Sequence, residues 1–83
     1  MPLKYTDEAL EEFHRLIGMN VKKAREAKGI TQLQLLNRLG YKSVSVVSKA
    51  EKCIEGKYFG IDHLFLISKE LEINICDLIS PPK

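Results

Sequence analysis

The sequence predicts an all-α fold of five helices in one domain, because 83 residues leave no room for a second core. Apolar residues recur at spacings of three and four, as on one face of an α-helix. No stretch alternates apolar and polar residues like a β-strand, and no internal repeat is present. Short connections separate the helical segments, which is typical of a small helical domain.

The first predicted helix extends from about residue 7 to residue 28. Its expected N-cap is Thr6, Tyr5 stands in a hydrophobic-staple position, and Gly29 ends it. Gly18 predicts a kink or a break into two pieces. The apolar stripe of this helix consists of Leu10, Phe13, Ile17, Val21 and Ala24.

Two short helices are predicted next. The first starts at Thr31, which forms a capping box with Gln34, and ends at Gly40. The second, about residues 44–53, begins after the N-cap Ser43. Its valines and serines have poor helix propensity, so tertiary packing must hold it. The residues expected on its buried face are Val47, Ala50 and Ile54.

A loop is predicted over residues 55–60, followed by a fourth helix over about 61–72 and a very short fifth helix. The fifth helix begins at Asn74, with Asp77 as its capping-box partner, and ends at Ser80 before two prolines. The stripe expected to be buried on the fourth helix consists of Ile61, Leu64, Ile67 and Leu71.

Charge is divided into three blocks along the chain. Residues 22–57 hold nine basic and three acidic residues, a net charge of +6, whereas residues 1–21 and 58–83 each carry −2. A basic middle between acidic ends indicates a polyanionic partner such as nucleic acid. The alternative is that these lysines only keep helix surfaces solvated.

Several function classes have no support in the sequence. No apolar run approaches the roughly 20 residues that cross a bilayer, and no signal peptide is recognisable, so we expect a cytoplasmic protein. No catalytic motif is present, and we expect neither an enzyme nor a cofactor. The possible metal ligands follow no common zinc spacing, and we expect no metal: His14, Cys53, His63 and Cys76.

Two short helices joined by a tight glycine-containing turn describe a helix-turn-helix. A longer pattern runs through and beyond these two helices, and its residues are Arg25, Gly29, Ile30, Thr31, Gln32, Leu36, Gly40, Ser43, Val47, Ser48, Lys49, Ala50, Glu51, Leu64, Ile67, Leu71, Asp77 and Leu78. Through these residues the chain resembles the Xre family of phage-repressor and Cro-like DNA-binding domains over about residues 16–80. The resemblance leaves 1–15 as an N-terminal helical extension of the first helix and 81–83 as a tail. The chain departs from the family at Leu36, where a small alanine is usual, and in a turn one residue longer.

The resemblance implies that the helix over about residues 44–53 enters the major groove. It further implies a structural ion pair between Arg25 and Glu51, for which two independent surface charges are the alternative. The alternative role of Val44 and Val46 is core packing. The alternative for Gln32 is a tolerated first position of its helix, and for Lys42, Lys52 and Lys57 it is a solvated surface position. The implied base-reading residues are Val44, Ser45, Val46 and Lys49. The implied phosphate-contacting residues are Thr31, Gln32, Lys42, Ser48, Lys52 and Lys57.

The function expected from this resemblance is sequence-specific binding of double-stranded DNA by a small homodimeric transcription regulator of the repressor, controller or antitoxin type. Two surfaces are candidates for the dimer contact. One is the N-terminal helix with Phe13, and the other includes Phe65, Leu66, Ile75 and Ile79. The rival interpretation is a protein-interaction module on the same fold, favoured by a base-reading set without Arg, Gln or Asn.

Overall fold

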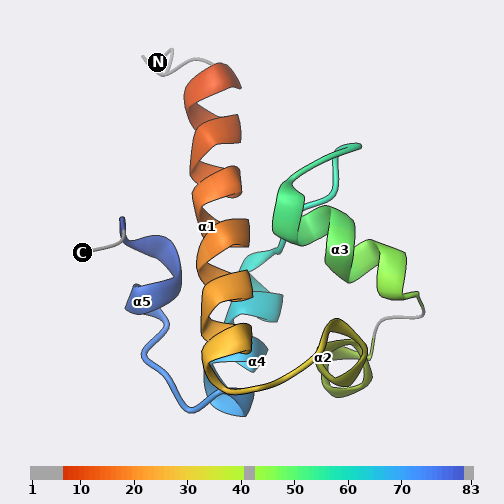
Figure 1. The fold of residues 1–83 in the computed structure, drawn as a ribbon. Helices are drawn as coiled ribbons and strands as arrows, with labels where there is room; N and C mark the ends of the chain where they lie inside the picture. Colours follow the sequence, from red (N-terminus) through yellow and green to blue (C-terminus); the bar gives the residue numbers. More distant parts are fainter. Residues whose placement is uncertain (1–6, 41–42, 82–83) are drawn as a thin grey trace.

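The structure, a computed structural model, describes residues 7–40 and 43–81 and contains five α-helices in those ranges (Figure 1). Within them no β-strand is present, so the all-α prediction is confirmed. No helix in the described part of the chain combines the length and apolarity needed to cross a membrane. The helices are α1 (Asp7–Ala27), α2 (Gln32–Leu39), α3 (Val44–Lys52), α4 (Ile61–Glu70) and α5 (Cys76–Ile79).

The long helix α1 continues through Gly18 without interruption, so the predicted break is wrong. Gly18 is buried against α3: a Cβ atom there would lie 2.5 Å from the carbonyl oxygen of Glu51 and 2.7 Å from that of Ala50. The glycine therefore allows the two helix backbones to touch. The predicted cap Thr6 and staple residue Tyr5 lie outside the described residues.

The predicted boundaries of α2 and the predicted start of α3 are confirmed. Thr31 Oγ1 accepts a hydrogen bond from the Gln34 backbone N–H at 3.1 Å, and Gln34 Oε1 accepts one from the Thr31 backbone N–H at 2.8 Å. Gly40 ends α2 with φ = 76°, a conformation that costs glycine little. Ser43 caps α3, its hydroxyl oxygen accepting from the Ser45 backbone N–H at 3.3 Å.

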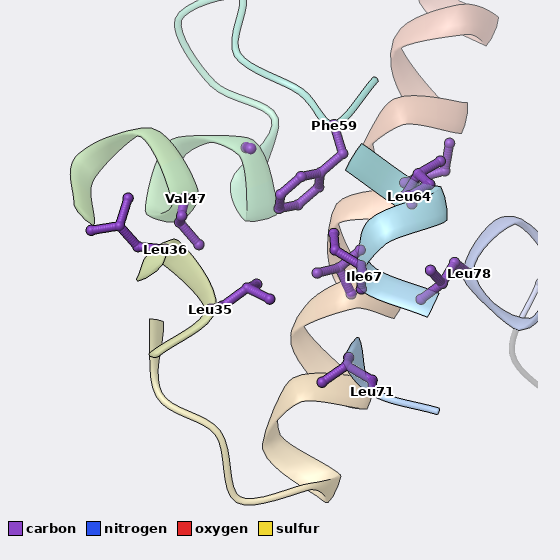
Figure 2. Close-up of a cluster of buried hydrophobic side chains, with 11 residues drawn as sticks. Leu35, Leu36, Val47, Phe59, Leu64, Ile67, Leu71 and Leu78 are labelled. Atoms are coloured by element: carbon purple, nitrogen blue, oxygen red, sulfur yellow. The ribbon is translucent and has the colours of Figure 1, made fainter. Parts of the chain in front are cut away.

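The hydrophobic core contains residues of all five helices, with α3 and α5 packed on α1 and α2 packed on α3 and α4 (Figure 2). Val47 and Ala50 are buried as predicted, but Ile54 is 45% exposed, because α3 ends at Lys52 and the chain turns at Cys53. Ile61 was also expected in the core and is 74% exposed. The core residues are Ile17, Val21, Leu35, Leu36, Val47, Ala50, Phe59, Leu64, Ile67, Leu71 and Leu78.

Phe59 explains the position of Ile61. This loop residue is 2% exposed and reaches the core from the segment just before α4 (Figure 2). Ile61, two residues later at the first position of α4, is left at the surface. The other predicted members of the α4 stripe, Leu64, Ile67 and Leu71, are buried.

The C-terminal helix α5 begins two residues later than predicted. Asn74 Oδ1 accepts a hydrogen bond from the Cys76 backbone N–H, and the Asp77 backbone N–H donates to the Asn74 carbonyl, both at 2.9 Å. Asn74 thus starts a turn before α5 instead of forming the predicted capping box with Asp77. The buried amide of Asn20 on α1 then fixes the end of α5, donating to the carbonyls of Leu78 at 3.0 Å and Ser80 at 2.8 Å.

Candidate nucleic-acid interface

Helix α3 packs against both α1 and α2, with one face packed and the other open (Figure 1). Val47 and Ala50 point into the core, which fixes the rotation of α3 about its axis. Ser45 and Lys52 are consequently exposed on its outer face, and Val44 is exposed at the first position of the helix. The resulting surface is a short helix with serines and lysines toward solvent.

A buried ion pair joins α1 to α3. Arg25 Nε donates to Glu51 Oε2 at 2.7 Å and Arg25 Nη2 donates to Glu51 Oε1 at 3.2 Å, with 9% and 1% of the two side chains exposed. Arg25 Nη1 also donates to the carbonyl of Ile30 at 2.8 Å. The hydrogen bond to Glu51 is the main cause that raises the pKa of Arg25 above its usual value. The structure thus brings together the two residues expected to pair.

Gln32, at the first position of α2, joins the same network. Its amide nitrogen donates to Glu51 Oε1 at 2.9 Å, so Glu51 accepts hydrogen bonds from both α1 and α2. An amide nitrogen carries two hydrogens, and this bond uses one. The expected phosphate contact of Gln32 would therefore come from a side chain that Glu51 already orients.

The expected base-reading residues all lie on α3 but differ in accessibility. Val44 is 39% exposed, whereas Val46 is half-buried. Ser45 is exposed, with its hydroxyl oxygen 2.8 Å from that of Ser43. Lys49 forms an ion pair with Glu55, from the loop that follows α3. Lys49 is therefore the one cationic residue of the expected base-reading set, and it is paired with the carboxylate of Glu55.

Glu55 is the residue that sequence reasoning missed at this surface. It has φ = 54° in the chain reversal after α3, which returns its side chain to Lys49. The hydrogen bond from Lys49 is the main cause that lowers the pKa of Glu55 from its usual value. No spacing rule relates the two residues, because the contact depends on the left-handed backbone of the loop.

The expected phosphate contacts surround this face. Lys52 and Lys57 are exposed, and Ser48 is half-buried. Thr31 is exposed, with its hydroxyl oxygen already accepting the capping hydrogen bond. Lys42 lies outside the described residues.

The histidines and cysteines considered as metal ligands have other surroundings. His14 stacks on Tyr58, their ring centroids 3.9 Å apart. His63 Nδ1 lies 3.8 Å from a carboxylate oxygen of Asp62. In residues 7–40 and 43–81, no three His, Cys, Asp or Glu side chains stand close enough to hold a metal ion.

Comparison of the chain with protein-family models, with curated proteins and with solved structures finds no match. The interpretation of the α2–α3 surface therefore rests on its own geometry and charge.

Proposed function

We propose that this protein binds double-stranded DNA with sequence preference, as a small homodimeric transcription regulator that places α3 in the major groove. The observation that carries this proposal is the capped α2–α3 pair, whose second helix is fixed by the buried Arg25–Glu51 ion pair. A helix held in this way keeps its outer face clear of the core. The major groove of B-DNA admits an α-helix, and each base pair presents a distinct pattern there.

Phosphate contacts would set the register of α3 on the duplex. Helix N-termini and side-chain amides donate to phosphate oxygens, and Thr31 and Gln32 stand at the start of α2. Lys52 and Lys57 are exposed and add charge without base information. In this mechanism the phosphates position the protein, and the first turns of α3 read the bases.

The base-reading surface is small. Lys49 reaches guanine acceptors only after it leaves Glu55, and Val44 suits a thymine methyl group. The set contains no Arg, Asn or Gln, whose planar side chains make bidentate contacts to bases. Sequence preference then depends largely on DNA shape and on two copies binding two half-sites.

The direct test is binding to a pool of random duplex DNA at increasing salt, followed by sequencing of the retained fraction. We expect affinity to fall steeply with salt and the retained DNA to share a two-fold symmetric site. Lys49→Glu should abolish retention. Lys23→Glu, which makes the same charge change at an exposed position of α1, should leave retention largely unchanged.

The rival function, a protein-interaction module on the same fold, is favoured by the pairing of Lys49 with Glu55, which neutralises the cation of the base-reading set. The same experiment separates the two functions. Absence of retained DNA at about 50 mM salt, where phosphate contacts are strong, would contradict DNA binding and favour the rival.

A further inference from the structure

An apolar groove of about 410 Å³ lies between α1, the start of α4 and the end of α5. Core residues Ile17, Phe59 and Leu64 contribute to its lining. The exposed large side chains that line it come from three helices and the loop before α4: Phe13, Tyr58, Ile61 and Ile79. Part of each surface predicted for the dimer contact meets at this groove, namely Phe13 of the N-terminal helix and Ile79 of the α4–α5 region. Of the other predicted residues, Leu66 is exposed outside the groove and Ile75 packs against the core.

The groove continues along α4 as an exposed apolar strip. Phe65 follows Ile61 by four residues, on the same face of the helix, and is 53% exposed. We define the dimer patch as Phe13, Tyr58, Ile61, Phe65 and Ile79. If each large side chain has roughly 200 Å² of surface, the exposed area of the five residues of the dimer patch is about 500 Å². Standard interfaces bury about 800 Å² per partner, so the patch would form most of one.

We propose that the dimer patch binds a second copy of the same chain through a two-fold symmetric interface. Such an interface uses the same surface on both copies, which must therefore be complementary to itself. The dimer patch meets this condition because it contains both a hollow and a projecting side chain. Ile61 is 74% exposed at the edge of the groove, so a two-fold axis can direct each Ile61 toward the groove of the other copy.

This inference rests in part on the proposed function, because two half-sites on DNA require two copies. The dimer patch contains no residue of α2 or α3, so its burial leaves the α2–α3 surface free for DNA. The dimer is tested without DNA, so the result does not depend on whether the protein binds DNA.

The test is the mass of the protein in solution, measured by sedimentation velocity over a range of concentrations. We expect the wild-type chain to form a dimer and Ile61→Lys to raise its dissociation constant by at least about tenfold, because the lysine charge would have to enter an apolar groove. Phe13→Lys should have the same effect. Met19→Lys is the matched control, since Met19 is 42% exposed, close to the 44% of Phe13, and lies on another face of α1. Circular dichroism confirms that each variant remains folded.

A wild-type chain that stays monomeric at every concentration would overturn the proposal. So would a dimer that Ile61→Lys and Phe13→Lys leave as tight as the wild type. A dimer that both variants dissociate, in a protein that retains no DNA, would support this interface and contradict only the proposed function.

Discussion

At the scale of single residues, the orientation of α3 depends most directly on Glu51. Its carboxylate accepts hydrogen bonds from Arg25 on α1 and from Gln32 on α2, while Glu51 itself belongs to α3. A buried carboxylate needs such donors, because an unpaired charge is costly away from water. Three helices are therefore fixed to one another at a single side chain.

Arg25→Ala tests this coupling. The variant leaves the Glu51 charge buried without its main partner, so we expect the free energy of unfolding to fall by about 3–5 kcal/mol, together with DNA affinity. Urea denaturation and DNA binding measure the two effects. The double variant Arg25→Met/Glu51→Met removes both charges and should lose much less stability. If Arg25→Ala changed neither quantity, the coupling between α1 and α3 would be wrong.

Glu55→Gln tests whether the loop carboxylate restrains Lys49. Without its charged partner, Lys49 is free to contact DNA, and we expect affinity to rise by up to about fivefold, the range of exposed ion pairs. Glu72→Gln is the matched control. Glu72 is also exposed, has the same φ of 54° after a helix, and belongs to the turn that follows α4. If DNA affinity rose equally in both variants, the cause would be the loss of a negative charge and not the release of Lys49.

The pH dependence of this difference follows from the lowered pKa of Glu55. The hydrogen bond from Lys49 shifts it below the usual 4.5, so the ion pair is fully formed above that value and is lost as the pH falls through the shifted pKa. We therefore expect the affinity difference between Glu55→Gln and wild type to be constant between about pH 6 and pH 8. Binding measured across this range checks it, and a change there would assign the effect to another group.

At the scale of elements, the close approach of α1 and α3 at Gly18 predicts whether Gly18→Ala raises or lowers the free energy of unfolding. On an exposed helix face, Gly→Ala stabilises by about 1 kcal/mol. At Gly18 the added methyl group would meet two backbone carbonyls of α3, so we expect Gly18→Ala to lower the free energy of unfolding by about 1–3 kcal/mol. Thermal or urea denaturation measures the change. Met19→Ala, one residue away and exposed, should change stability by much less; a stabilised Gly18→Ala would contradict the packing.

Local signals and tertiary contacts account for what the sequence could and could not predict. The caps of α2 and α3 depend on neighbouring residues, so Thr31, Gln34 and Ser43 were identified correctly. The periodic stripes held only in part. Ile54 and Ile61 are exposed because a turn or a loop residue replaces them, and Leu10 and Phe13 of the predicted α1 stripe are 42% and 44% exposed. Spacing alone gives no sign of these replacements.

In the candidate site, too, the contacts that depend on tertiary structure could not be predicted from sequence spacing. Arg25 and Glu51 were expected together because a family resemblance supplied the pairing, not because their positions in the chain require it. The ion pair of Lys49 with Glu55 depends on a left-handed residue in the loop, and the carbonyl contacts of Gly18 depend on how α3 docks. Both needed the three-dimensional arrangement.

At the scale of the whole molecule, the two proposed surfaces use different helices. The α2–α3 surface carries the exposed Lys52 and the half-buried Lys49, whereas the dimer patch gathers apolar residues from α1, α4, α5 and the loop before α4. Because the surfaces are separate, damage to one should leave the intrinsic affinity of the other unchanged.

The separation of the two surfaces predicts how binding depends on the number of half-sites in the duplex. Wild-type protein should bind duplex with two half-sites cooperatively, and Ile61→Lys should lose the cooperativity while keeping wild-type affinity for a single half-site. Gel-shift titrations on the two duplexes measure both quantities. Reduced affinity of Ile61→Lys for the single half-site would show that the two surfaces are not independent.

The hydrogen bonds of Asn20 have a consequence for synthesis of the chain. Its amide donates to carbonyls that lie 58 and 60 residues further along the sequence. Although α1 is translated first, both hydrogen bonds, and the packing of α5 on α1 that they complete, can form only after Ser80 has been translated.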